Sequence, residues 1–101
     1  MTNDELRAFV LSFEGIEERQ HQGRPDFRLK GKIVVNLDED ERVITIKLSL
    51  DDQAALMARN DSTFTLPGGW AKHGWTTISL ASGDDDEIRE LVTEVIDMMR
   101  L

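Results

Sequence analysis

Basic and aromatic side chains gather in two short segments of this chain, and both segments could take part in ligand binding. Residues 19–32 include five basic residues and one acid, Asp26, so they carry a charge of +4 although the whole protein carries −8. Residues 68–75 read Gly-Gly-Trp-Ala-Lys-His-Gly-Trp and combine three glycines with two tryptophans, a lysine and a histidine. Cationic groups next to aromatic rings can bind phosphates and stack on a base or another planar group. The two segments together are therefore a candidate site for nucleic acid or a phosphate-bearing ligand.

Alternation along the expected strands indicates which of these side chains share a face. Phe27 and Leu29 alternate with Asp26, Arg28 and Lys30, so we expect the apolar pair to face the core. The same alternation in neighbouring strands places basic and aromatic side chains on the opposite, open face of the sheet. The candidate ligand-binding residues are Arg19, His21, Arg24, Arg28, Lys30, Lys32, Trp70, Lys72, His73 and Trp75.

Each part of this candidate site also has an interpretation that involves no ligand. Charged strand residues often only solvate an exposed face while their aliphatic stems cover apolar surface. Arg24 could pair with one of the many acids of the chain instead of holding a carboxylate or phosphate. The glycine-rich segment could be a hairpin whose tryptophans cap the core, and Trp70 is then the better candidate for the buried one.

Catalytic and metal chemistry is poorly supported by the residue types. The chain has no cysteine and no tyrosine, and its two histidines, His21 and His73, lack the spacing of metal ligands. The acidic run 84–87 lacks the pattern of a calcium loop and is explained by helix capping. No glycine loop of the Walker or dinucleotide type is present. We therefore expect a protein that is not an enzyme and needs no metal or cofactor.

Length and composition favour one small domain over residues 1–101. The charged fraction of 32% and the apolar fraction of 40% are typical of a globular protein. The absence of cysteine fits a reducing compartment, no apolar run reaches the ~20 residues needed to span a bilayer, and the polar start does not resemble a signal peptide. We expect a cytoplasmic location and no membrane contact. The negative net charge opposes long-range attraction to nucleic acid.

Capping signals and periodicity predict the order of helices and strands. Thr2 and Glu5 have capping-box spacing before an apolar stripe, which predicts a first helix that ends near Gly15. The acidic run 84–87 precedes the strongest apolar stripe and predicts the start of a last helix. Between these helices we expect strands at 16–21, 26–30, 32–37 and 42–48, a short helix at 49–59, and strands at 63–66 and 75–80.

The strands have one apolar face each, and this determines the expected architecture. In the third strand, Ile33, Val35 and Leu37 alternate with polar residues, so we expect all three to face the core. Such strands form an antiparallel sheet that helices cover on one face only. The predicted fold is α+β and two-layered, in the order α-β(3-4)-α-β(2)-α.

Two motifs resemble those of a known family. His21, Gly23-Arg24-Pro25, Phe27-Arg28 and Gly31-Lys32 form the first, and Gly69-Trp70-Ala71-Lys72-His73-Gly74-Trp75-Thr76 forms the second. With the order of helices and strands, they make the chain similar to the MmcQ/YjbR-like family of small bacterial proteins. The resemblance implies an α+β fold of the secretion-chaperone-like kind and a DNA-binding role through a "double-wing" motif. It supplies no catalytic residue.

Two functional hypotheses follow from these observations. In the first, the chain is a binding module for nucleic acid or a phosphate-bearing ligand, which binds on a cationic sheet face. In the second, it is a protein-interaction or adaptor domain, which could be dimeric, with no role in nucleic-acid binding.

Overall fold

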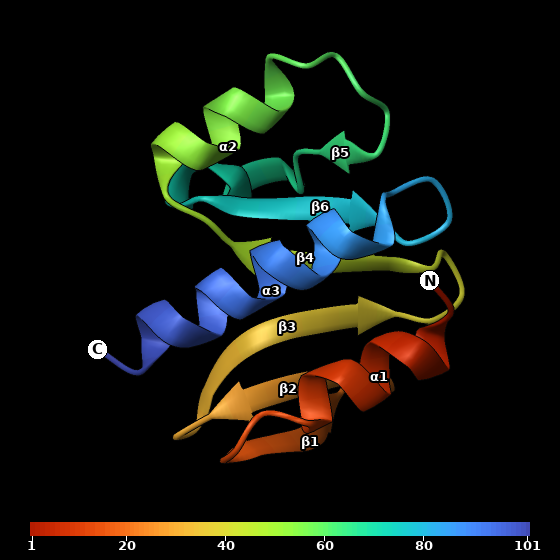
Figure 1. Ribbon diagram of the computed structural model, residues 1–101, viewed down its shortest axis with the longest axis vertical. Coiled ribbons are helices and arrows are strands. Elements are labelled where there is room, and N and C mark those ends of the chain that lie inside the picture. The colour runs from red at the N-terminus through yellow and green to blue at the C-terminus, as the bar shows by residue number, and fades with distance from the viewer.

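Six antiparallel strands form one sheet in the order β1-β2-β3-β4-β6-β5, with α-helices packed against it (Figure 1). The computed structural model describes residues 1–101. The helices are α1 (Asn3–Leu11), α2 (Leu50–Met57) and α3 (Asp85–Met99), and a 3-10 helix, η1, spans Gly68–His73. The strands are β1 (Ile16–His21), β2 (Arg24–Leu29), β3 (Lys32–Asp38), β4 (Val43–Lys47), β5 (Phe64–Thr65) and β6 (Trp75–Ser79).

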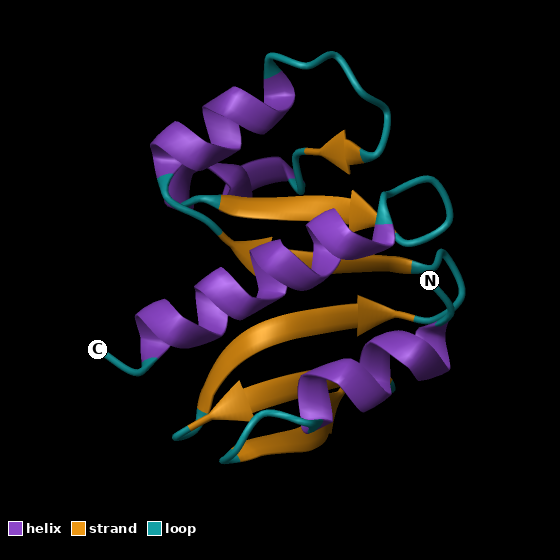
Figure 2. Ribbon diagram, viewed as in Figure 1, coloured by secondary structure: helices purple, strands orange, loops and turns teal.

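The sheet and helices form two layers. Helices α1 and α3 lie across the same face of the sheet, α1 next to β1 and α3 next to β3 and β4 (Figure 2). Buried apolar side chains from both layers form one continuous core, which includes Phe27, Ile44, Ile78 and Val92. Neither α1 nor α3 covers the opposite side, which we call the open face. The expected two-layer α+β fold with an antiparallel sheet is confirmed.

Local sequence signals determine where several of these elements begin. The Thr2 hydroxyl accepts a hydrogen bond from the Glu5 amide, and the Glu5 carboxylate accepts one from the Thr2 amide, so the expected capping box is present. Asp84 caps α3 in a similar way by accepting from the Glu87 amide. These contacts satisfy backbone donors that would otherwise lack a partner at each helix start.

The β2–β3 connection is a tight turn. Lys30 and Gly31 both have positive φ, at 53° and 81°, which is typical of the two-residue turns that match the twist of a hairpin. The sheet becomes irregular immediately after this turn. Asp26 and Phe27 pair with Asn36 and Val35, but Arg28 pairs with Ile33, so Val34 is an extra residue on β3.

This β-bulge changes the facing of one predicted core residue. Val34 and Val35 are both buried in the core, while Ile33 lines a hollow on the open face. The expectation that Ile33 faces the core was therefore wrong. An extra residue in a strand reverses which sheet face the side chains before it point to.

Candidate ligand-binding face

A polar row crosses the open face from one edge strand to the other. Cross-strand pairing joins Arg19 to Asp26, Asp26 to Asn36 and Asn36 to Thr45, and the row continues through Thr77 to Thr65. The hydroxyl oxygens of Thr45 and Thr77 lie 3.1 Å apart. Because paired residues point to the same side, this row places uncharged hydrogen-bonding groups in the middle of the open face.

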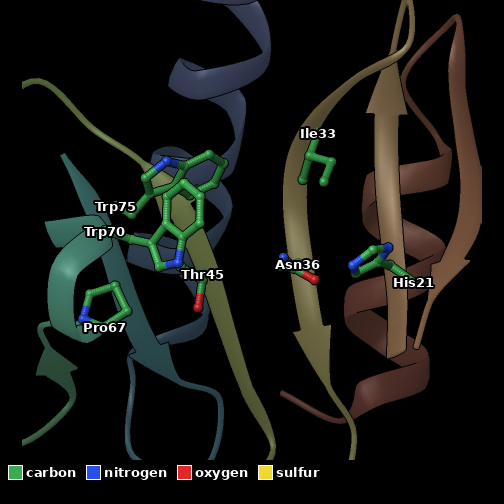
Figure 3. A pocket seen from close by; sticks show the side chains of 7 residues that line it. All are labelled: His21, Ile33, Asn36, Thr45, Pro67, Trp70 and Trp75. Carbon is green, nitrogen blue, oxygen red and sulfur yellow. The ribbon is translucent and has the colours of Figure 1, made fainter. Parts of the chain in front are cut away.

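A hollow of about 450 Å³ lies over this row (Figure 3). Trp70, Trp75 and Pro67 border one side of it, and His21, Ile33 and Asn36 come from the other side, as the close view shows. Its lining residues are His21, Ile33, Asn36, Thr45, Pro67, Trp70 and Trp75. The open face therefore offers aromatic surface and side-chain hydrogen-bonding groups within one cavity.

Trp70 is a surface residue, so the alternative in which it caps the core was wrong. Its exposed fraction is 68%, and no residue of η1 is buried. Phe64 of β5 and Leu56 of α2 belong to the core cluster, whereas Trp70 lines the hollow of the open face.

Two contacts hold the tryptophan-bearing segment in place. The Gln53 side-chain amide of α2 lies within hydrogen-bonding distance of the Ala71 carbonyl at 3.1 Å and of the Trp75 carbonyl at 3.0 Å. Gly74 ends η1 with a φ of 96°, and its carbonyl accepts a hydrogen bond from the Leu48 amide at 2.9 Å. These contacts tie η1 to α2 and to the end of β4, so the positions of both indoles depend on them.

The arginines of the open face are paired with carboxylates. Arg19 lies 3.2 Å from Glu17, and Arg24 lies 3.3 Å from Asp38, which is the intramolecular pairing considered for Arg24. Both pairs are exposed to solvent on the arginine side, so they are weak.

The third arginine pair is of a different kind. The Arg28 Nε donates to Asp26 Oδ1 at 2.9 Å and Nη2 donates to Oδ2 at 3.1 Å, while Asp26 is completely buried. This two-bond contact raises the pKa of the Arg28 guanidinium above its ordinary value, mainly through the hydrogen bonds to Asp26. Arg28 is therefore committed to Asp26 and is not a free cation.

The lysines, by contrast, have no carboxylate partner within ion-pairing distance, and they share one end of the molecule. Lys30 lies in the β2–β3 turn, Lys32 begins β3, Lys47 ends β4, and Lys72 lies in η1 just before β6. This is the end where the C-terminus of α3 lies, on the left of Figure 1. The acidic β3–β4 turn and the N-terminus of α3 lie at the opposite end. The four lysines are therefore gathered at one end of the molecule, which we call the lysine end, and Asp51 and Asp52 of α2 follow β4 at the same end.

The structure brings together only some of the residues that the sequence suggested. His21, Trp70 and Trp75 line the hollow, and a second, adjoining hollow is lined by Arg28, Lys32 and Trp75 among others. Neither hollow is lined by the remaining candidates, which are Arg19, Arg24, Lys30, Lys72 and His73.

Several lining residues were not among the sequence candidates. Asn36 and Thr45 occupy polar positions that alternate with apolar ones in their strands, so alternation alone could have found them. Lys47 could have been found in the same way at the end of β4. No sequence signal marks Ile33, because its facing depends on the bulge.

The structure shows neither a metal-holding cluster nor a membrane-spanning helix. No group of three or more histidine, aspartate or glutamate side chains converges to hold a metal ion. None of the helices combines the length and the apolarity that crossing a bilayer requires.

Fold and site together define a small α+β domain with an open antiparallel sheet whose free face carries an aromatic-lined hollow. The chain belongs to the YjbR family, because the model of that family matches residues 11–95. A comparison with curated proteins found no match.

Proposed function

We propose that this domain binds an unpaired nucleobase, carried by a nucleotide or a single-stranded nucleic acid, in the hollow of its open face. The observation that carries the proposal is the exposed Trp70 indole at a hollow that also contains Trp75 and Asn36. Bases that are free of a partner stack on aromatic side chains and hydrogen-bond through their edges to amide and hydroxyl groups. The hollow supplies both kinds of group.

The distribution of charge supports a single strand or nucleotide over a duplex. The bases of a duplex are already stacked, so the indoles would have nothing to bind, and a duplex would have to be held through its phosphates alone. The arginines that the sequence suggested for that purpose are paired with acids in this structure. The unpaired lysines at one end of the sheet are suited to the few phosphates next to a bound base.

Titration followed by amide-resolved NMR tests this proposal. A short single strand, the duplex of the same sequence and a nucleoside monophosphate are compared at low salt. We expect the single strand to shift the amides of residues 68–75 and of Asn36. Since stacking on an aromatic side chain contributes ~1–3 kcal/mol, Trp70→Ala should weaken binding by about 5-fold to 150-fold.

The matched control is Leu11→Ala, which removes another exposed apolar side chain at a position on α1 that lines neither hollow. This variant should bind the single strand like the unchanged protein. Equal binding by Trp70→Ala, or tighter binding of the duplex than of the single strand, would count against the proposal.

A protein partner is the second candidate, and one specific observation favours it. Two large apolar side chains are exposed just after the two-residue edge strand β5. They are Leu66 and Trp70, with exposed fractions of 51% and 68%. An apolar surface beside a sheet edge can accept an extended segment of another chain, including a second copy of this one. Light scattering after size exclusion tests the self-association. A concentration-dependent dimer that Leu66→Asp abolishes supports this candidate, and a strict monomer contradicts the dimeric form.

A further inference from the structure

The sheet opens between β3 and β4 at the lysine end. These strands pair only through Asn36–Thr45, Leu37–Ile44 and Asp38–Val43, so the first half of β3 has no partner in β4. Figure 1 shows β3 curving away from β4 toward the β2–β3 turn, past the last turns of α3. The space left between the strands is a cavity of about 690 Å³, which we call the interstrand slot.

The walls of the interstrand slot are mainly apolar. Ile33 and Trp75 contribute from the side of the open face, Leu48 follows the end of β4, and α3 contributes Val95, Met98 and Met99. Met98 is 63% exposed although it lies beside this cavity. Methionine side chains are flexible and polarisable, so they adapt to the shape of an apolar ligand. The volume is in the range that small ligands occupy.

The charged residues of the slot are all cationic. Arg28, Lys32 and Lys47 line it, and no acid does, in a chain with twenty acidic residues. Arg28 is already bonded to Asp26, whereas Lys32 and Lys47 have no carboxylate within ion-pairing distance. Two unneutralised cations thus lie beside apolar walls, one on each of the strands that separate.

We propose that the interstrand slot binds an anionic amphiphile, a ligand with an alkyl chain and a carboxylate or phosphate head. The chain lies along the apolar walls formed by α3 and Trp75, and the head is held by Lys32 and Lys47 from the two strands. Each buried methylene contributes to affinity, and the pair of ammonium groups selects the charged head over a neutral one. This site is distinct from the proposed base-binding hollow, although both include Ile33 and Trp75.

Binding of octanoate, octyl phosphate and octanol to the full chain tests this proposal, with each compound kept below its micelle-forming concentration. Calorimetry gives the affinities, and the methyl resonances of Met98 and Met99 report the location. We expect both anions to bind and to shift these methyl resonances. The neutral alcohol should bind more weakly by a factor of roughly ten or more. The tighter of the two anions identifies the head group that the site prefers.

Variants separate a specific site from general attraction to a cationic end. Lys32→Gln combined with Lys47→Gln should weaken octanoate binding roughly tenfold or more. The matched control, Lys30→Gln combined with Lys72→Gln, removes the same charge from positions that do not line the slot and should weaken the affinity much less. All of these lysines are on the surface, so the fold is expected to persist.

Three results would overturn the proposal: no binding of either anion at millimolar concentration, equal affinity for octanol, or equal losses in the two double variants. Trp70→Ala distinguishes this site from the base-binding hollow, because Trp70 does not line the slot. That variant should keep octanoate binding while losing affinity for the single strand. The two proposals can therefore fail separately.

Discussion

Replacing Gly74 by alanine should destabilise the protein more than any other glycine substitution in the tryptophan-bearing segment. Gly74 has a φ of 96°, a backbone conformation that residues with a Cβ rarely adopt. A Cβ built at this position would lie 2.0 Å from the carbonyl oxygen of Leu48. The two backbones are close because the Leu48 amide donates a hydrogen bond to the Gly74 carbonyl at 2.9 Å. The substitution therefore affects both the turn and its attachment to β4.

The magnitude follows from these two effects. A left-handed conformation costs a residue with a Cβ about 1–2 kcal/mol. Forcing an additional group into a packed site typically costs about 1–3 kcal/mol, and here the neighbour is backbone, which cannot rotate away. The free energy of unfolding should fall by about 2–5 kcal/mol, a large part of the ~5–15 kcal/mol that stabilises an ordinary domain.

Urea unfolding followed by tryptophan fluorescence measures this change, because Trp75 directly follows Gly74 and Trp70 precedes it by four residues. The matched control is Gly69→Ala in η1, where a Cβ meets no atom within 4 Å and φ is not in the left-handed region. This control should change the free energy of unfolding by less than about 0.5 kcal/mol. If the two variants unfold at the same urea concentration, the close approach of Gly74 to Leu48 is not as described.

Three further changes test other contacts. Asp26→Ala should lower the free energy of unfolding by about 2–4 kcal/mol, because it leaves the partly buried Arg28 guanidinium without its acceptor. A thermal melt measures this change, and an unchanged melting temperature would show that the pair does not stabilise the fold. Gln53→Leu should lower the free energy of unfolding by about 1–3 kcal/mol and speed amide hydrogen exchange in η1. If the η1 amides of this variant stay as protected as before, Gln53 does not position η1. The Thr63 backbone amide lowers the pKa of Asp61, so the stability that this carboxylate contributes is present at neutral pH and is lost as pH falls through its folded-state pKa. Asp61→Asn should therefore flatten the loss of stability below about pH 4, as measured by urea midpoints across pH, and an unchanged slope would contradict this assignment.

Local signals in the sequence were sufficient for the order of elements and for the two layers. The Thr2 capping box, the alternation in β2 and β4, and the apolar stripe of α3 each depend on neighbours within a few residues, which the chain itself supplies. The turn at Lys30-Gly31 likewise depends only on neighbouring residues. These features could be predicted because no distant contact competes with them.

The details of the open face depend on distant contacts and could not be predicted in the same way. The bulge that turns Ile33 outward is a mismatch between two strands, and no single residue signals it. The surface position of Trp70 belongs to η1, which contacts from α2 and from the end of β4 hold in place. The separation of β3 from β4 is likewise a property of the whole sheet. Composition indicated cationic residues near aromatic ones, but not which cations remain free.

The difference between paired and free cations makes the salt dependence of binding informative about the site. For a single strand, the logarithm of the binding constant falls with the logarithm of salt concentration by about 0.7 for each phosphate that the protein neutralises. If only Lys32 and Lys47 contact phosphates, the slope should be about −1.4. Arg28 adds nothing because Asp26 holds it with two hydrogen bonds, but the exposed guanidinium groups of Arg19 and Arg24 could exchange their carboxylate partners for phosphates.

Displacement of both pairs would bring the number of neutralised phosphates to four and the slope to about −2.8. Titrations of one oligonucleotide between low and moderate salt distinguish these values, and Arg24→Gln should move the slope toward zero only in the second case. A slope near zero with binding intact would mean that stacking alone holds the strand, and the lysine end would then have no part in nucleic-acid binding.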